Sequence, residues 1–237
     1  MKHSIVDIRK EFEEICETLA STDFVGFLNR VGEDYAEFYK WRDRYWPECN
    51  RDNVGGINFS AGCTRLVIIP PAGNYVFKIQ YDTSDEVDFC RNERFVYSKA
   101  VERSCEEFFA WIDCIGKYGS VLVYAMEKVE VNEDRNSDDS YTYHANRWHE
   151  EHDEDEEDMY IDDYDDHDGM IEYAIAHNGP RMEIAEQLIY DLGVNDLHSA
   201  NWGYRGDVLV AVDYGGYGDD AYRIARITKG EEYDEEE

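Results

Sequence analysis

The stretch Asn195–Gly215 constrains the fold more than any other part of the chain. Asp196 and Asn201 lie five positions apart within it, and a turn then leads into the apolar run Val208–Val212. The run ends at Asp213-Tyr-Gly. An apolar run that stops at an aspartate and a glycine is typical of a buried strand that carries a carboxylate out of the core. We therefore predict a hairpin that delivers a metal-binding carboxylate to a site.

Composition limits the classes of function that the chain can have. Its 237 residues suffice for one large domain or two small lobes, and 43% apolar residues suffice for a core. The formal net charge is −32, from 55 Asp and Glu against 23 Lys and Arg. This charge argues against direct binding of DNA or RNA, because such proteins need the opposite sign. It favours a basic protein partner, or imitation of a nucleic acid's charge.

The cysteines and the N-terminus indicate an intracellular protein. Six cysteines occur without a Cys-x-x-Cys pair, so we expect reduced and mostly buried thiols and no disulfide framework. We find no signal peptide pattern and no apolar run near the ~18 residues that a membrane span needs. We therefore expect a cytoplasmic protein without a membrane partner. The cysteines are Cys16, Cys49, Cys63, Cys90, Cys105 and Cys114.

The first third of the chain is predicted to be helical and then to change into strands. Apolar residues recur at three- and four-residue steps over residues 4–45, which predicts three amphipathic segments, the last of them ending at Trp46-Pro47. Gly55–Gly62 is predicted as a loop flanked by short strands. Residues 64–70 and 75–81 then form a predicted hairpin. Lys78 in its second strand is either an exposed edge position or a functional cation.

Residues 84–126 are predicted to continue as two helices and a buried strand. The first helix covers 84–103 and carries Glu93, which is either a solvated charge or a functional carboxylate. The second covers 105–115, where Phe108, Phe109, Trp111 and Ile112 make an apolar face, and the strand covers 120–126.

The segment that follows is dominated by like charges. Thirteen of the 19 residues in 150–168 are acidic, which predicts a mobile insertion or a solvated face. The histidines in or beside it, which have no tight ligand spacing, are expected to be solvated in preference to binding a metal. Apolar helical segments follow over 171–176 and 182–192, and the acidic tail 231–237 is expected to fray. These histidines are His144, His149, His152 and His167.

Taken in order, these segments resemble the protein-kinase fold family. Asp196–Asn201 matches the Asp-x-x-x-x-Asn core of the kinase catalytic loop, and Asp213-Tyr-Gly is similar to the Asp-Phe-Gly metal motif. Val76-Phe-Lys78-Ile is similar to the strand that carries the phosphate-binding lysine. Ser60-Ala-Gly62, 16 residues before Lys78, falls where the phosphate-covering loop should end.

The resemblance implies an α+β, bilobal protein-kinase-like fold. It covers about residues 54–130 and 170–216, and the remaining segments are additions to it. The implied parts are a helical N-terminal element over 1–53, an N-lobe over 54–130, an acidic insertion over 131–169, a shortened C-lobe over 170–230 and the acidic tail 231–237.

The resemblance also implies a role for each site residue, with ATP and Mg²⁺ as cofactors. Lys78 would hold the α- and β-phosphates, and Glu93 would be its helix partner, although Glu86 lies on the same predicted helix and is an alternative. Asp196 would orient the attacking hydroxyl or act as its base. Asn201 and Asp213 would bind the metal, while Gly62 and Met126 would line the nucleotide site.

Several features depart from the usual kinase pattern. Val194-Asn195 replaces the usual His-Arg, His198 replaces a lysine, and the full Gly-x-Gly-x-x-Gly pattern is absent. Only 22 residues follow Gly215, without an Ala-Pro-Glu segment. The run Asp-Leu-His-x-x-Asn is closer to aminoglycoside phosphotransferases. It is also similar to the compact early protein kinases of T7-like phages.

The sequence therefore supports three hypotheses about function. The first is a phage-type serine/threonine kinase that transfers phosphate from Mg·ATP to host proteins. The second is a weak or inactive kinase-fold protein whose charge mimics DNA and blocks a basic host protein, such as a defence nuclease or a polymerase. The third is a small-molecule phosphotransferase, which His198 favours. The acceptor, the host partner and the oligomeric state stay open.

Overall fold

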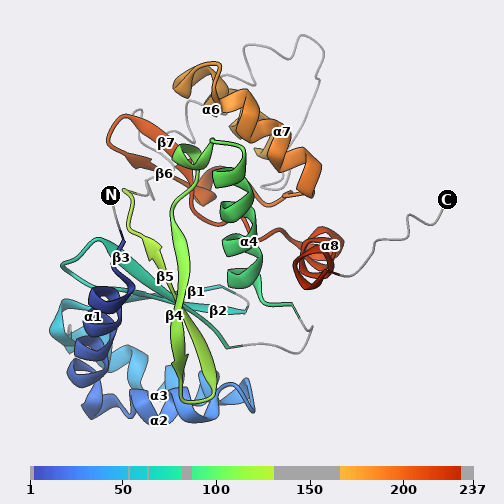
Figure 1. Cartoon of the computed structure of the whole chain (residues 1–237). Coiled ribbons are helices and arrows are strands. Elements are labelled where there is room, and N and C mark those ends of the chain that lie inside the picture. The colour runs from blue at the N-terminus through green and yellow to red at the C-terminus, as the bar shows by residue number, and fades with distance from the viewer. Residues whose placement is uncertain (1–2, 53, 63, 82–86, 131–165, 231–237) are drawn as a thin grey trace, which may run out of the picture. The chain divides into compact units, whose positions relative to one another are not determined.

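The computed structural model describes residues 3–52, 54–62, 64–81, 87–130 and 166–230 (Figure 1). It is a mixed α+β structure, as the sequence predicted, and it divides into two compact units. Unit 1 comprises Met1–Cys90 and Ile112–Lys128, and unit 2 comprises Arg91–Trp111 and Val129–Glu237. None of the described helices combines the length and the apolar character that crossing a bilayer requires.

Unit 1 is built on a five-stranded antiparallel sheet with the strand order β1-β2-β3-β5-β4. The hairpin predicted over 64–81 is confirmed as β2 and β3. The segment predicted as a loop over 55–62 contains a strand of its own, β1, because Asn58–Ala61 pairs along β2. The strands are β1 Asn58–Ala61, β2 Arg65–Ile69, β3 Tyr75–Gln80, β4 Ile112–Tyr118 and β5 Val121–Glu127.

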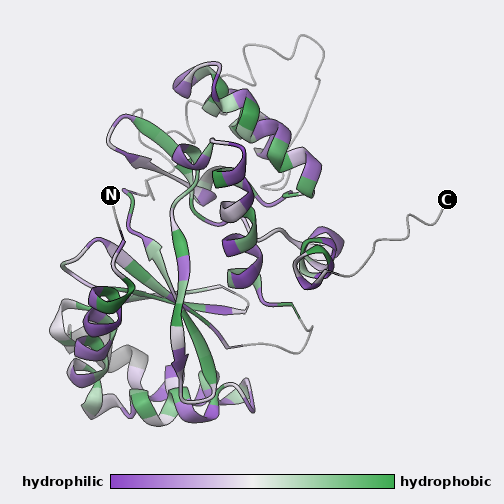
Figure 2. Cartoon of the chain, in the orientation of Figure 1, coloured by the Kyte–Doolittle hydropathy of each residue, from purple (hydrophilic) through white to green (hydrophobic). Residues whose placement is uncertain are grey.

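The predicted N-terminal helices are present and cover one face of this sheet. Phe12 of α1 packs against Phe77 of β3, and Phe38 of α3 stacks on Tyr81 with 3.8 Å between ring centroids. Figure 2 shows hydrophilic and hydrophobic residues alternating along α1, as an amphipathic helix requires. The three helices are α1 Ile5–Thr18, α2 Phe24–Arg30 and α3 Ala36–Asp52.

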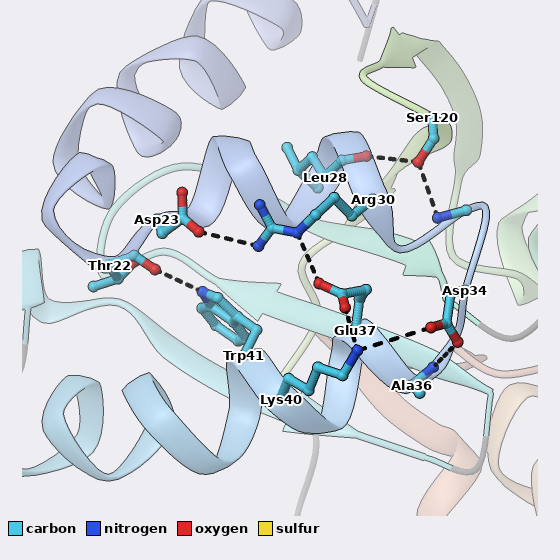
Figure 3. A network of polar contacts seen from close by, with 11 residues as sticks. Thr22, Asp23, Leu28, Arg30, Asp34, Ala36, Glu37, Lys40, Trp41 and Ser120 are labelled. Atoms are coloured by element: carbon cyan, nitrogen blue, oxygen red, sulfur yellow. Dashed lines mark hydrogen bonds and ion pairs between the residues drawn. The ribbon is translucent and has the colours of Figure 1, made fainter.

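Polar contacts fix these helices to each other and to the sheet (Figure 3). Arg30 of α2 pairs with Asp23 at 3.0 Å and with Glu37 of α3 at 2.7 Å. Ser120, in the turn between β4 and β5, donates its hydroxyl to the Leu28 carbonyl at 2.8 Å. The helical element is therefore attached to the sheet by a directed hydrogen bond as well as by aromatic packing.

Unit 2 combines helices with one two-stranded hairpin. Helix α4 begins at the boundary, so that Phe89 and Cys90 belong to unit 1 and its remaining residues to unit 2. Asn178, at the end of α6, makes two hydrogen bonds with the backbone of Leu209 in β7 and so ties helix to hairpin. The elements are α4 Phe89–Glu102, α6 Asp166–Asn178, α7 Met182–Leu192, β6 Trp202–Arg205, β7 Val208–Ala211 and α8 Gly218–Lys229.

The prediction of a helix over 105–115 was wrong. A single 3₁₀ turn covers Glu106–Phe108, and the chain then extends into β4. A dense apolar run fits helical and strand periods equally well, so the pairing partner decides between them. Here Ala110 donates its N–H to the carbonyl of Ala211, which is distant in sequence, and β4 pairs with β5, the next strand along the chain.

Two helix boundaries also differ from the predictions. Helix α3 continues through Pro47 to Asp52, because a proline removes one backbone donor and does not forbid the next turn. Helix α4 begins at Phe89 and not at Ser84. Gln80 binds the Val87 carbonyl and the Phe89 N–H, which satisfies these groups outside a helix.

The described cysteines are reduced thiols, as expected. Cys90 and Cys105 are buried, whereas Cys16 and Cys114 are half-buried. Burial raises the pKa of both Cys16 and Cys105 to about 11, so these thiols stay protonated and unreactive at neutral pH. The side chains of Cys49 and Cys63 lie outside the described residues, as do the acidic residues 131–165 and the tail 231–237.

Candidate functional site

The loop that carries Asp196 follows directly from helix α7 and is held by its neighbours. Gly193 ends the helix with φ +69°, a left-handed conformation that favours glycine. Both backbone groups of Leu197 are then taken: its N–H donates to His167 Nδ1 at 3.1 Å, and its carbonyl accepts from Trp202 Nε1 at 2.9 Å. The backbone beside Asp196 is therefore fixed from two sides.

The side chain of Asn201 closes this loop. It is 9% exposed, and its Nδ2 donates to the Asp196 carbonyl at 2.6 Å and faces His198 Nε2 at 3.2 Å. One amide hydrogen of Asn201 is thus directed back into the loop, at the Asp196 carbonyl. Oδ1, which can only accept, is the Asn201 atom suited to face a cation.

The hairpin predicted within Asn195–Gly215 is confirmed over residues 202–211, and it brings Asn201 and Asp213 to the same end. Trp202 pairs with Ala211, and the Val212 N–H donates to the Asn201 carbonyl at 2.9 Å, one step beyond the strands. Asp213 follows at once. The backbones of Asp196, Asn201 and Asp213 therefore lie near one another in unit 2, because the loop and the hairpin are continuous in the chain.

Tyr214 anchors the turn behind Asp213 in the core of unit 2. Its ring is fully buried in edge contact with Phe109, and its hydroxyl donates to the Ala110 carbonyl. Burial raises the pKa of Tyr214 well above its usual value, and the nearby carboxylate of Glu93 adds to the effect. The tyrosine is therefore a neutral, hydrogen-bonded core residue.

Glu93 is not the solvated charge that a mid-helical glutamate usually is. It is 0% exposed within α4, so that interpretation was wrong. A carboxylate buried to this degree needs compensation from neighbouring groups. Glu86, the alternative carboxylate, lies outside the described residues.

Lys78 belongs to unit 1 and is 5% exposed on β3, which lies between β2 and β5. The interpretation as an exposed edge position was therefore wrong. Lys78 pairs with Tyr124, and Val76 pairs with Met126, so all four side chains share one face of the sheet. Phe77 points to the other face, where the N-terminal helices pack.

The remaining predicted site residues also lie in unit 1. Met126 is a buried residue of β5, on the Lys78 face. Gly62 is exposed in the turn between β1 and β2, where its carbonyl accepts from the Tyr81 hydroxyl at 2.7 Å. Tyr124 also donates its hydroxyl to Asp88, just before α4, at 2.7 Å.

Sequence reasoning missed several residues that hold these groups in place. Gln80 fixes the start of α4, His167 binds the Asp196 loop, and Asn92 and Asn195 bind the segment behind Asp213. His167, Asn92 and Asn195 act on backbone groups distant in sequence, so no spacing rule reveals their roles. Of these residues, only Asn195 could have been singled out from the sequence, because it directly precedes Asp196.

The donor set in unit 2 fits Mg²⁺. This ion prefers hard oxygen ligands and usually takes one or two from the protein, with waters and phosphates supplying the others. The Asp213 carboxylate and Asn201 Oδ1 are oxygens of this hard type. No group of three or more His, Cys, Asp or Glu side chains among the described residues could form a metal cage of its own. Of the four histidines considered for such a site, His144, His149 and His152 lie outside the described residues, and His167 contacts Leu197.

Comparisons of the chain with protein-family models, with curated proteins and with solved structures gave no match.

Proposed function

We propose that the chain is a Mg·ATP-dependent phosphotransferase of the protein-kinase type, with serine and threonine side chains of host proteins as acceptors. The observation that carries this proposal is the gathering of Asp196, Asn201 and Asp213 at one end of the loop and hairpin of unit 2. Phosphoryl transfer needs positioning and charge neutralisation more than covalent chemistry. One orienting carboxylate and two metal ligands meet that need.

In this proposal each residue of the cluster has a separate task. Asp196 accepts a hydrogen bond from the acceptor hydroxyl, aligns it with the γ-phosphate and takes up its proton. Asn201 Oδ1 and the Asp213 carboxylate hold Mg²⁺, which when bound neutralises charge on the phosphate oxygens. The hydrogen bonds around Leu197 and Asn201 support this role, because they keep the groups preorganised.

Unit 1 would supply the phosphate-binding cation. Lys78 is almost fully buried on a central strand, and a buried ammonium is stable only beside anionic groups. We propose that Lys78 binds the α- and β-phosphates of the nucleotide. Met126 on the same sheet face and Gly62 in the β1–β2 turn would then contact the nucleotide.

The test is transfer of the γ-phosphate from labelled ATP, together with a Mg·ATP-dependent thermal shift. Asp213→Asn should abolish transfer and retain the fold. Asp219→Asn, an exposed aspartate in the first turn of α8, is the matched control and should transfer like the wild type. Lys78→Met should weaken ATP binding, whereas Lys117→Met on the exposed part of β4 should not.

The acceptor class is decided in the same assay. Label on serine or threonine of lysate proteins, or of the chain itself, would support the proposed class. Label on an added aminoglycoside and on no protein would replace it with a small-molecule phosphotransferase, which His198 favours. Absence of both transfer and a Mg·ATP-dependent thermal shift in the wild type would reject phosphotransferase function.

The net charge of −32 favours one competing function, imitation of nucleic acid against a basic host protein. A charge mimic should lose its partners steeply as salt rises, because screening shortens the range of its field. Capture from host lysate at increasing NaCl tests this. Retained host effects after deletion of residues 150–168, which hold the densest negative charge, would reject mimicry.

A further inference from the structure

The segment behind Asp213 is short and passes directly into a helix. Gly215 is followed after two residues by α8, which begins at Gly218. The segment Gly215–Ala221 is thus a turn and the first residues of a helix, all within unit 2. Its conformation determines where the backbone of Asp213 lies, since only Tyr214 separates the two.

Asn92 holds this segment from α4. It is 1% exposed, and its Nδ2 donates to the Gly215 carbonyl at 3.1 Å and to the Ala221 carbonyl at 2.9 Å. Both amide hydrogens are used, one at each end of the segment. A buried amide that joins two backbone carbonyls in this way fixes their separation, because leaving either of its two hydrogens without an acceptor is costly.

Asn195 holds the same segment from the other side. Its Oδ1 accepts the Tyr217 N–H at 2.9 Å, and its Nδ2 donates to Asp220 Oδ2 at 2.8 Å. Asn195 directly precedes Asp196. One side chain therefore ties the loop of the proposed base to the segment behind the proposed metal ligand.

We propose that Asn92 and Asn195 are positioning residues that set the Asp213 carboxylate in a single arrangement. Together they form an amide brace: Asn92 binds both ends of Gly215–Ala221, and Asn195 binds Tyr217 and Asp220 within it. The metal-binding geometry is then present in the unmodified chain and requires no phosphorylation of the segment. The consequence for metal binding rests on the proposed function, whereas the brace itself is a property of the fold.

The test uses Asn195, which is exposed, because its substitution is compatible with folding. Asn195→Asp keeps the oxygen that accepts the Tyr217 N–H. It also replaces the group that donates to Asp220 at 2.8 Å with a second carboxylate, which repels Asp220. In the double variant N195D/D220N the residue at 220 donates and the residue at 195 accepts, which restores the hydrogen bond in the reverse direction. The net charge is unchanged. D220N alone is the further control.

Two readouts are measured on the full chain. Hydrogen exchange of the Tyr217 amide should be about tenfold faster in N195D and should return close to the wild-type rate in N195D/D220N. Binding of Mn²⁺ in the presence of ADP, followed by the EPR signal of free Mn²⁺, should weaken several-fold in N195D and recover in the double variant. Unmodified wild type, verified by mass spectrometry, should bind Mn²⁺ with ADP.

The outcomes separate the brace from the proposed function. Unchanged exchange at Tyr217 in N195D would overturn the brace. Faster exchange with unchanged Mn²⁺ affinity would overturn its positioning role. Wild type that binds Mn²⁺ with ADP only after phosphorylation would overturn the preset arrangement. Wild type that binds no Mn²⁺ in any form would reject the proposed function, and the exchange rates would still decide whether the brace exists.

Discussion

Two independent features favour glycine at position 216, which directly follows the Asp213-Tyr-Gly turn in the sequence. Its φ is +80°, in the left-handed region that other residues adopt at a cost. A Cβ at this position would also lie 3.0 Å from Ile224 Cδ1 and 3.3 Å from the Ala221 Cα and N atoms. The backbone here is therefore pressed against α8, and space as well as conformation is restricted.

Gly218 offers a matched comparison for a first prediction. It has φ +54° but no atom within 4 Å of a built Cβ. We expect Gly218→Ala to lower the free energy of unfolding by about 1 kcal/mol, the conformational cost alone. Gly216→Ala should cost about 2–4 kcal/mol, because overpacking against α8 adds to that cost. Urea denaturation of both variants measures the difference, and equal losses would contradict the close packing.

At the scale of elements, the turn between β4 and β5 is where the sheet holds the N-terminal helices. Ser120 accepts the Gly32 N–H at 2.9 Å and donates to the Leu28 carbonyl at 2.8 Å (Figure 3). Both partners lie at or just after the C-terminal end of α2, where backbone groups lack partners within the helix. One hydroxyl therefore connects two elements far apart in the sequence.

The second prediction concerns this connection. Ser120→Ala leaves the Gly32 N–H without its acceptor, and we expect a loss of about 1–3 kcal/mol in the free energy of unfolding. Lys10→Ala, which removes an exposed ion pair with Glu14 at 3.6 Å, is the control and should be close to neutral. Thermal and urea unfolding measure both variants. A Ser120 variant as stable as the control would show that aromatic packing alone fastens the helices.

Helix α6 gives the third prediction through His167. Burial lowers the pKa of His167 below its ordinary value of 6.5, against an opposing effect of Asp168. The unfolded chain therefore takes up a proton below pH 6.5 that the folded chain binds only at lower pH. The contribution of neutral His167 to the free energy of unfolding is present above pH 6.5. It is lost as the pH falls through the pKa that His167 has in the folded chain.

The variant His167→Asn isolates this effect. Its amide oxygen can accept the Leu197 N–H, as His167 Nδ1 does at 3.1 Å, but it does not titrate. Urea midpoints should fall more steeply for the wild type than for the variant between about pH 7 and about pH 5. If the urea midpoints of wild type and variant changed with pH in the same way, His167 would have the same pKa in the folded and unfolded chain.

In the molecule as a whole, repulsion among the excess acidic side chains is the dominant electrostatic effect. A net charge of −32 keeps the chain soluble but opposes its compact state. The basic residues that the structure places in ion pairs, such as Arg30 with Asp23 and Glu37, balance only a small part of this charge.

The fourth prediction follows from screening. Raising NaCl from about 10 mM to about 300 mM shortens the Debye length several-fold, so we expect the thermal midpoint to rise by several degrees. A nonionic osmolyte at matched osmolality is the control for preferential exclusion. A midpoint that falls with NaCl would mean that specific ion pairs outweigh the net repulsion.

The sequence by itself determined the features in which neighbours along the chain suffice. The hairpin found over 202–211 and the N-terminal helices follow from periodicity and turn residues. The N-terminal boundary of α4 and the extent of α3 were predicted less well, because caps and prolines bias a helix end without fixing it.

The tertiary structure alone decided everything that depends on distant partners. Phe109 and Ala110 are extended because they pair with Ala211, a residue distant in sequence, which no local pattern encodes. Lys78 and Glu93 have sequence neighbourhoods that suit exposed charges equally well, and only packing of the sheet and of α4 buries them. Asn92 and Asn195 are ordinary polar residues until the fold places backbone carbonyls and amides in front of them. Burial and directed hydrogen bonds between remote residues are properties of the assembled chain, and the proposed site depends on both.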